Sequence, residues 1–424
     1  ADRGPNDDAA PRATEDAARP PADAAFAPAA VDDECPTAWD HVVPGADRPC
    51  AGRHAMRLAI VAKPDTLAIA RSDQGRVLIG WNELTFADDG AYYLRLIQDR
   101  TFGQLDAFEL GPEAAFGDVV GAASALAVLR ETFHLLVWRQ TDQGGRLEYR
   151  RMLAGGEPGD PEIVAGSLGD HGDVDAVVSP NGDIDVAWHD KQTGVYAARS
   201  RAAGDGTWAA PFELDTDLDL ATPGSGRVAL SLGEARVVHA VYQLGRSRDG
   251  AAPTARSRIG AQPWGSHRTL DNAANRRLSG VGVRLAVIGD LRVAAYLDWV
   301  GGTGEVRLAR WTSDDAAAQL ETRVSGLSLG RPPGAFPLAL AADAGGLLHL
   351  VTPAFRDGTW TLEYHRQTQG PDGPVWLVDT VDGDLDMESD PVRAALVVDA
   401  DRRPHIVWFD PGDGEIRYAT ILSE

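Results

Sequence analysis

The chain has 424 residues and a formal net charge of −23, with 63 acidic against 40 basic side chains. A surface of this charge repels polyphosphate, which argues against nucleic acid and against anionic membranes as partners. Apolar residues make up 44% of the sequence, enough for a large core. No apolar stretch is long enough to form a transmembrane segment.

Residues 1–34 are rich in alanine, proline and acidic residues, and only Phe26 and Val31 offer bulky apolar surface. A segment of this composition cannot bury enough surface to offset its ordering entropy, so we expect a disordered N-terminal linker. A short amphipathic helix over residues 22–31 is the alternative. The start at Ala1, without methionine or a signal peptide, is typical of a processed export product or of a trimmed chain.

Residues 35–54 form a lead-in that contains both cysteines, Cys35 and Cys50, on either side of a polar loop. We expect a disulfide between them, worth on the order of 3 kcal/mol. Two unrelated buried thiols are the alternative. A disulfide favours an oxidising location, which is the extracellular space, the periplasm or the cell surface.

The rest of the chain, residues 55–424, is repetitive. An apolar run that ends in a large aromatic residue recurs about every 55 residues, and threonine replaces the aromatic once. These repeat positions are Trp81, Trp138, Trp188, Tyr242, Tyr296, Thr352 and Trp408. Because such aromatic side chains recur in register, we expect them to be buried packing anchors.

Each repeat contains four short strand signals separated by Gly-, Asp- or Asn-rich turns. The third strand alternates tyrosine and arginine, and the fourth often opens with tryptophan and ends on an acid, as in WAAPFELD, WGSHRTLD and WLVDTVD. Alternating strands with a turn about every ten residues indicate an all-β fold. Four strands in each of seven repeats predict a seven-bladed β-propeller with four antiparallel strands per blade.

The last repeat has only three strands, and an open sheet edge is an aggregation hazard. We therefore expect an N-terminal strand to complete the last blade and close the ring. The segment Ala55–Lys63 has strand character, lies before the first complete repeat and has no partner strand there. Residues 39–43 are a weaker candidate for the same place.

A motif of the form Gly-x-x-His, two apolar residues, an aromatic, an acid, a glycine turn and Arg-Tyr-Ala occurs in residues 403–420, 182–199 and partly 345–366. It resembles the repeat of secreted bacterial seven-bladed propellers of the sialidase-like (BNR-like) superfamily. The resemblance covers residues 55–424 and implies the fold. It implies no sialidase activity, because recognisable Asp-boxes and the Arg-Ile-Pro motif are missing, with only RIG at Arg258.

Acidic residues recur two positions after the repeat aromatic, at Glu83, Asp190, Asp298 and Asp410. The first interpretation is that each caps its hairpin by accepting from turn amides. The alternative is a ring of carboxylates that binds a hard cation or a cationic partner. The loops at residues 169–175, 215–219 and 382–390, which lead into inner strands, are also acidic, and the first interpretation is that they are solvated. The alternative is calcium binding, with Asp384, Asp386 and Asp390 as the candidate, although the full calcium-loop pattern is missing.

The third repeat concentrates candidate ligand-binding side chains on one expected face, namely Asp170, His171, Asp173, His189 and Asp190. Arg227, Arg284 and Arg393 begin inner strands, where they would point toward the channel mouth. Guanidinium groups there suit the carboxylate of an acidic sugar, or they pair with neighbouring acids as a structural network. His239, His349 and His405 share one repeat position and are expected to be packing residues.

The leading functional hypothesis is an exported, non-catalytic propeller that binds a glycan, a cell-envelope component or a partner protein. The first alternative is a glycoside hydrolase or lyase with its site at the channel mouth, where ligands of propellers usually bind. The second is a structural surface protein. Calcium is the one candidate cofactor, and a monomer is expected.

Overall fold

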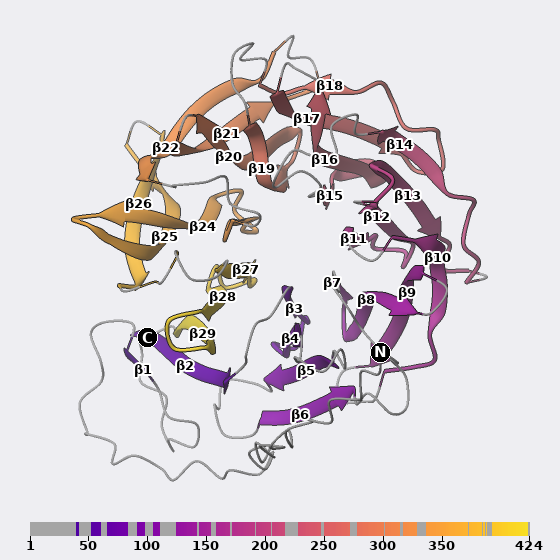
Figure 1. Cartoon of the computed structure of the whole chain (residues 1–424), viewed down its shortest axis with the longest axis horizontal. Helices are drawn as coiled ribbons and strands as arrows, with labels where there is room; N and C mark the ends of the chain where they lie inside the picture. Colours follow the sequence, from indigo (N-terminus) through magenta and orange to yellow (C-terminus); the bar gives the residue numbers. More distant parts are fainter. Residues whose placement is uncertain are drawn as a thin grey trace, which may run out of the picture.

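The fold is all-β, as predicted. The computed structural model describes residues 40–41, 52–60, 66–83, 91–97, 105–110, 124–141, 144–153, 158–169, 172–190, 192–204, 206–216, 228–246, 250–271, 278–300, 302–313, 317–328, 336–371, 373–383, 385, 387 and 392–422. These residues form β-strands and one short 3-10 helix, η1 (Glu234–Arg236). The strands are arranged in a ring around a central axis (Figure 1). Within the described part of the chain, no helix could span a membrane.

The first three sheets each contain four antiparallel strands in sequence order. The first sheet contains β3 (Leu67–Arg71), β4 (Val77–Glu83), β5 (Ala91–Ile97) and β6 (Leu105–Leu110). The second contains β7 (Ser124–Leu129), β8 (Thr132–Thr141), β9 (Gly144–Leu153) and β10 (Glu162–Leu168). The third contains β11 (Gly172–Val178), β12 (Ile184–Asp190), β13 (Val195–Arg201) and β14 (Phe212–Thr216). In each sheet the first strand lies nearest the axis (Figure 1).

The next sheet contains eight strands rather than four. They are β15 (Val228–Leu232), β16 (Val237–Arg246), β17 (Gly250–Ile259), β18 (Arg268–Thr269), β19 (Leu278–Ile288), β20 (Leu291–Val300), β21 (Thr303–Trp311) and β22 (Gln319–Ser328). Within each half, neighbouring strands are antiparallel. One parallel pair, Ala251 with Leu278, joins β17 of the first half to β19 of the second. The structure thus has six blades when blades are counted as hydrogen-bonded sheets, and the prediction of seven is wrong on this count.

The cause of this fusion lies in the fourth strand of the first half. The sequence WGSHRTLD predicted a full strand, whereas β18 has two residues and pairs only with Thr254 and Ala255. Pro253 in β17 has no N–H, so it cannot complete a ladder with an outer strand. The edge of β17 at Ala251 therefore stays open, and the start of β19 pairs with it.

The ring is closed by the N-terminal part of the chain. A four-stranded sheet contains β23 (Ala339–Ala342), β24 (Leu348–Arg356), β25 (Thr359–Gly370) and β26 (Gly373–Asp382). The final sheet contains β27 (Arg393–Val398), β28 (Pro404–Asp410), β29 (Glu415–Leu422), β2 (Gly52–Ile60) and β1 (Asp40–His41), in the order β27-β28-β29-β2-β1.

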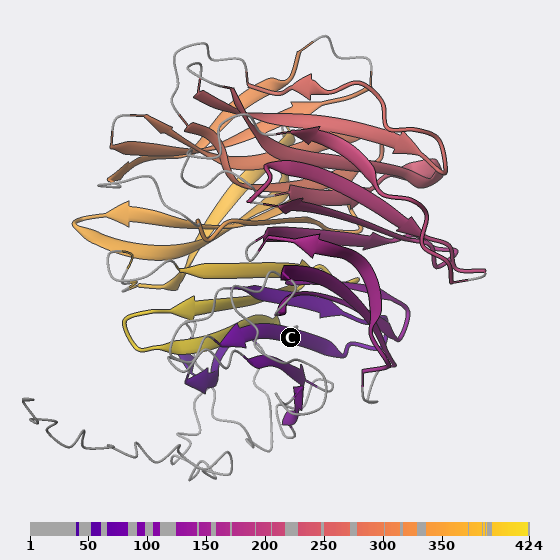
Figure 2. The ribbon, with the colours of Figure 1, turned by 45° about the vertical axis from the view of Figure 1, so that its right-hand side comes forward.

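Strand β2 pairs antiparallel with β29, from Gly52 opposite Leu422 to Ile60 opposite Glu415. The predicted closure by an N-terminal strand is therefore confirmed, with the strand starting three residues before Ala55. Of the weaker candidate, residues 39–43, only Asp40 and His41 are described, and they form β1, which pairs with β2 in parallel one place further out. Figures 1 and 2 show the indigo β2 next to the yellow β29 from two directions.

The repeat aromatic residues are buried packing anchors, as predicted. Several also tie one repeat to the one before it, because their polar atom donates to the end of the preceding outer strand. Trp408 Nε1 lies 2.9 Å from Asp382 Oδ2, and the Tyr296 hydroxyl lies 2.9 Å from Asp271 Oδ2. The acid that ends the fourth strand in the sequence is thus the acceptor for the next repeat.

The recurrent histidines are also packing residues. The Nδ1 atoms of His349 and His405 each lie 2.6 Å from a tyrosine hydroxyl on the next strand, that of Tyr364 and Tyr418. His239 Nδ1 lies 2.7 Å from the hydroxyl of Ser257. All three histidines are buried within their own sheets, so they do not converge on a shared ligand.

Candidate functional site

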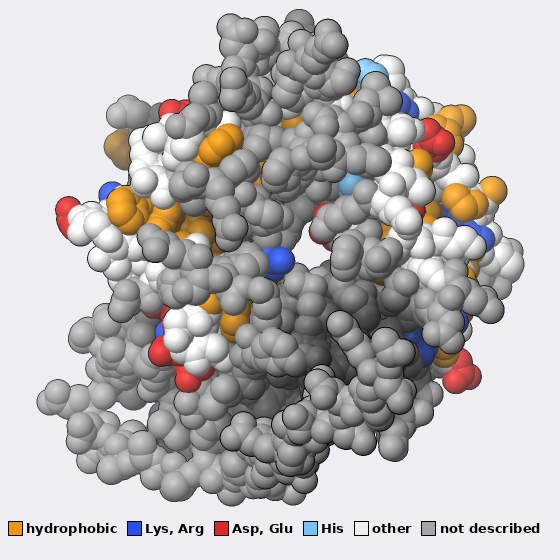
Figure 3. All heavy atoms as spheres, viewed as in Figure 1, with side chains coloured by type: hydrophobic (Ala, Val, Ile, Leu, Met, Phe, Trp, Pro, Cys, Tyr) orange, Lys and Arg blue, Asp and Glu red, His pale blue; other side chains and the backbone are white. Residues whose placement is uncertain are grey.

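A cavity of about 190 Å³ lies on the axis of the ring. Its walls come from the innermost strands β3, β7, β11, β15, β19, β23 and β27. Figure 3 shows the central opening on one face, with a basic side chain at one side and an acidic one across from it. Because every inner strand contributes to the wall, side chains that are far apart in sequence meet here.

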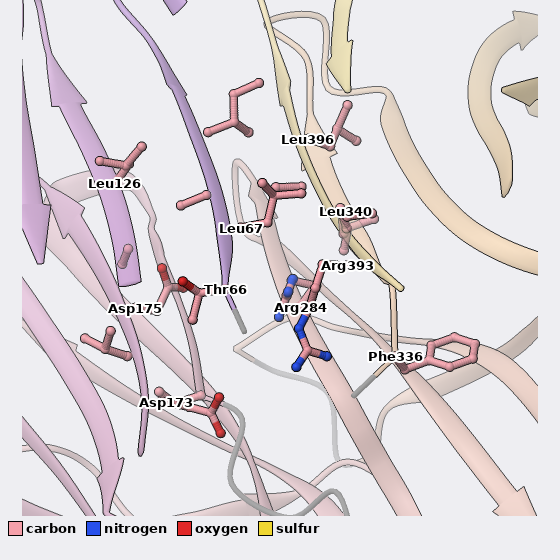
Figure 4. A pocket seen from close by; sticks show the side chains of 18 residues that line it. Thr66, Leu67, Leu126, Asp173, Asp175, Arg284, Phe336, Leu340, Arg393 and Leu396 are labelled. Atoms are coloured by element: carbon pink, nitrogen blue, oxygen red, sulfur yellow. The ribbon is translucent and has the colours of Figure 1, made fainter. Parts of the chain in front are cut away.

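Two arginines form one wall of the cavity. Arg284 lies on β19 and Arg393 is the first residue of β27. Their guanidinium groups lie side by side (Figure 4). The Arg284 guanidinium donates to the carbonyl of Val283 at 3.0 Å. Both side chains are half-buried, so the cavity meets two cationic groups.

Two carboxylates lie across from the arginines, on β11. Asp173 and Asp175 both line the cavity, because residues two apart in a strand point to the same face. Figure 4 shows both carboxylates opposite the guanidinium pair. The two aspartates and two arginines carry formal charges that cancel, so the cavity is of mixed charge rather than purely cationic.

Asp175 is held by backbone amides from two strands. Its Oδ2 accepts from Leu230 N on β15 at 2.8 Å, and its Oδ1 accepts from Ala176 N at 2.9 Å. Burial raises the pKa of Asp175 to about 6, against the two amides and Arg284, which lower it. Its side chain still keeps partial access to the cavity.

The structure separates the residues that the sequence grouped into one site. Asp173 pairs with His189 across the β11–β12 ladder, but the His189 ring is buried and stacks on Tyr196 at 4.2 Å between centroids. Asp190 accepts from the backbone N of Gln192 at 2.9 Å, which is the cap geometry. Neither His189 nor Asp190 lines the cavity. Of the described members of this group, Asp173 alone lines the cavity.

The other recurrent acids also have local partners. Asp410 caps its hairpin through Gly412 N at 3.0 Å, and Asp298 contacts the Arg307 guanidinium at 3.1 Å. Among the described residues, no group of three or more His, Cys, Asp or Glu side chains is arranged to bind a metal. Several predicted residues lie outside the described part of the chain or have no described side chain: Cys35, Cys50, Glu83, Asp170, His171, Arg227, Asp384, Asp386 and Asp390.

A second cavity, of about 580 Å³, lies between β24–β26 and the last sheet. Its polar wall contains Arg417, whose Nη1 lies 2.8 Å from Asp382 Oδ2 and 2.9 Å from Asp410 Oδ2. Burial raises the pKa of Asp410, Arg417 lowers it, and Asp382 raises it. The same arrangement recurs around Arg307, with Asp271 and Asp298 each at 3.1 Å. Since this network repeats at two seams of the ring, it is explained as an inter-repeat tie.

Asp175 is the site residue that the sequence reasoning missed. The segment GDVDAVV places an acid at Asp173 and again at Asp175, and this period-two spacing at the start of an inner strand was the available signal. It was read as part of an acidic loop. Because β11 begins at Gly172, both acids belong to the strand and face the channel.

No protein-family model and no curated relative matches the sequence. Among solved structures, the chain is similar to an ulvan lyase bound to -[GlcA(1-4)Rha3S]-, with a TM-score of 0.51 and 12% identity over 85% of this chain and 92% of that one. The polysaccharide lyase Uly1 aligns with a TM-score of 0.50 and 11% identity, over 86% of this chain and 91% of that one.

The NanB sialidase from Streptococcus pneumoniae is a more distant neighbour, with a TM-score of 0.42 and 9% identity, over 86% of this chain and 69% of that one. This likeness is too distant to carry an argument. At these identities the two polysaccharide lyases show the fold alone. The chain therefore has the β-propeller architecture, with polysaccharide lyases and a sialidase among its structural neighbours.

Proposed function

We propose that the protein binds an acidic glycan, without catalysis, by holding a sugar carboxylate in the axial cavity. The observation that carries this proposal is the pair of guanidinium groups, Arg284 and Arg393, side by side on one wall. Guanidinium forks match the two oxygens of a carboxylate, and hydrogen bonds between ionised partners are about twice as strong as neutral ones.

The size of the cavity limits the ligand. Its volume of about 190 Å³ is below the roughly 300–1,000 Å³ of sites for drug-sized ligands, so it suits one sugar unit rather than a chain. The carboxylates of Asp173 and Asp175 on the opposite wall can accept from sugar hydroxyls. The formal charge of −23 repels long polyanions, which favours a chain end or a short acidic oligosaccharide.

The comparisons support this class of ligand. The ulvan lyase with the same fold has a bound ligand that contains glucuronic acid, a sugar that carries a carboxylate. That ligand belongs to the lyase, and its chemistry agrees with what the arginine pair here would bind.

Titration calorimetry with glucuronic acid and short glucuronate-containing oligosaccharides tests the proposal. We expect Arg284→Gln and Arg393→Gln each to weaken binding about tenfold, because each removes a charge-assisted hydrogen bond. Arg402→Gln is the control, because its side chain is 59% exposed on a turn. Equal affinity of the cavity variants and the wild type would show that the arginine pair does not bind the ligand.

A catalytic role, as a glycoside hydrolase or lyase, is the second candidate, and one observation favours it. Asp173 and Asp175 both line the cavity from one face of β11, and glycosidases use a pair of carboxyl groups that flank the scissile bond. Burial also brings the pKa of Asp175 to about 6, near the working range of a general acid or base. Turnover of a uronate-containing polysaccharide that Asp175→Ala abolishes would establish this role, and its absence over a broad panel would leave binding alone.

We also propose that the two halves of the eight-stranded sheet are separate modules of the repeat. Each half keeps its own antiparallel strands, and a single ladder pair joins the two sets of strands, beside the side-chain contacts of Tyr296 and Arg307 with Asp271. On this view the ring has seven modules, as in the sialidase-like propellers that the sequence resembles. Hydrogen exchange tests it, because independent modules predict faster exchange at Ala251 and Leu278 than within either half, and uniform protection would contradict it.

We further propose a location outside the cytoplasm, in the periplasm, at the cell surface or beyond it. The support is the pair Cys35 and Cys50, whose spacing favours a disulfide, together with an acidic glycan as ligand. The intact mass of protein from its native source should increase by two hydrogens on reduction. An unchanged mass would remove this support.

A further inference from the structure

Asp175 lies where it can decide which anions enter the cavity. It shares the β11 face with Asp173 and lies across from Arg284 and Arg393, the two cationic groups of the cavity. A ligand drawn to the arginines must therefore also meet a carboxylate wall. An anion without hydrogen-bond donors meets only repulsion there, whereas a sugar ring brings hydroxyl donors.

The backbone fixes the Asp175 carboxylate in this position. The amides of Leu230 and Ala176 each donate to one of its oxygens, at 2.8 Å and 2.9 Å. Each carboxylate oxygen has about two lone pairs, so both oxygens keep acceptor capacity for a ligand. A carboxylate held from two strands cannot swing away when an anion enters, which makes its repulsion persistent.

We propose that Asp175 is the specificity-determining residue of the channel site, and that it selects carboxylates carried on a polyhydroxy sugar ring over carboxylates without hydroxyl groups. This inference rests on the proposed glycan-binding function. Arg284 and Arg393 supply attraction for any carboxylate, and Asp175 supplies the discrimination between carboxylates.

The selectivity depends on pH in a defined direction. Because burial raises the pKa of Asp175 to about 6, its repulsive charge is present at pH 7.5 and is largely lost at pH 5. The charged groups that face it across the cavity are Arg284 and Arg393, and Asp173 lies beside it on β11. The arginines stay charged throughout this range. Carboxylates without hydroxyls should therefore bind better as the pH falls.

Calorimetry with two matched probes tests the inference: glucuronate, and cyclohexanecarboxylate, which has a six-membered ring and a carboxylate but no hydroxyl groups. For the wild type at pH 7.5 we expect glucuronate to bind more tightly. Asp175→Asn should reduce the affinity ratio about tenfold, because it removes the charge and weakens the acceptor for sugar hydroxyls. Asparagine keeps an oxygen for Leu230 N, but its NH2 group then faces Ala176 N, so thermal denaturation is used to check that the variant folds.

The wild type at pH 5 provides a second measurement that needs no variant, and its affinity ratio should approach that of Asp175→Asn at pH 7.5. Asp290→Asn is the control, because it removes the same charge from a side chain that is 62% exposed and away from the cavity. If glucuronate binds but both the variant and the pH change leave the ratio unaltered, the inference is wrong and the proposed function stands. If glucuronate does not bind the wild type, both are overturned.

Discussion

Buried histidines make the stability of this protein sensitive to acid. Burial lowers the pKa of His239 to about 4, and the nearby Arg292 lowers it further, against Asp290, which raises it. Burial likewise lowers the pKa of His134 to about 4. A histidine whose folded-state pKa lies below its unfolded value stabilises the fold fully above pH 6.5. This contribution is lost as the pH falls from 6.5 toward 4.

His239→Gln should therefore reduce the acid sensitivity of folding. We expect the loss in the free energy of unfolding between pH 6.5 and 4 to become smaller by about 3 kcal/mol, since each pKa unit corresponds to about 1.4 kcal/mol. Urea denaturation at several pH values measures this loss. His267→Gln is the control, because its side chain is 47% exposed. Equal acid sensitivity of His239→Gln and the wild type would contradict the assignment.

Of the charged residues that line the cavity, Asp173, Arg284 and Arg393 were predicted from the sequence and Asp175 was not. Arg393 begins β27 as predicted, whereas Arg284 lies within β19 (Leu278–Ile288) rather than at its start, although both line the cavity. The sequence did not distinguish Asp175 from a solvated acid, because burial and the amide of Leu230 come from a strand far along the chain. His189 was misplaced because tertiary stacking on Tyr196 buries it.

Among the strands, the ties between successive repeats hold the ring together. Arg417 on β29 contacts Asp382 of the preceding sheet at 2.8 Å and its own hairpin acid Asp410 at 2.9 Å, and Arg417 and Asp410 are both buried. Removing the cation leaves a buried carboxylate without its partner, which is a larger loss than the net contribution of the ion pair.

Arg417→Met should accordingly lower the free energy of unfolding by about 3–5 kcal/mol. Arg402→Gln should change it by about 1 kcal/mol or less, because Arg402 is 59% exposed and contacts Asp343 at 3.6 Å. Guanidinium denaturation of both variants measures the difference. A similar small effect for the two variants would show that the Arg417 network is not a structural tie.

The strands were predicted correctly where alternating apolar and polar residues were bounded by turn residues. The prediction failed at one outer strand, β18. Four-stranded antiparallel sheets with tight hairpins were predicted from local signals, and the structure has them. The shortening of β18 depends on which residue of β17 lies beside it. Pro253 of β17 occupies that position and has no N–H to donate, so the effect appears only when the two strands are paired. Register between strands is not a local property, so the fused sheet could not be predicted from either segment alone.

For the whole molecule, closure is the feature on which stability depends. Strand β2 covers the edge of β29 along its length, and without it that edge would present unpaired backbone groups. This long-range pairing was predictable, because the last repeat lacks one strand and the segment before the first repeat has one to spare.

Deletion of residues 1–60 should therefore promote aggregation and lower the midpoint of thermal unfolding. Deletion of residues 1–34 alone should leave both properties unchanged, since β1 and β2 remain. Size-exclusion chromatography and thermal denaturation distinguish the two truncated chains. A monomeric, equally stable protein that begins at residue 61 would contradict closure by β2.

We propose above that the axial cavity binds a sugar carboxylate between the arginine and aspartate walls. A crystal structure of the protein soaked with glucuronate tests it most directly. We expect a sugar whose carboxylate contacts Arg284 and Arg393 and whose hydroxyls face Asp173 and Asp175. A sugar bound instead beside Arg417 in the second cavity, or an axial cavity that holds only water at saturating glucuronate, would contradict it.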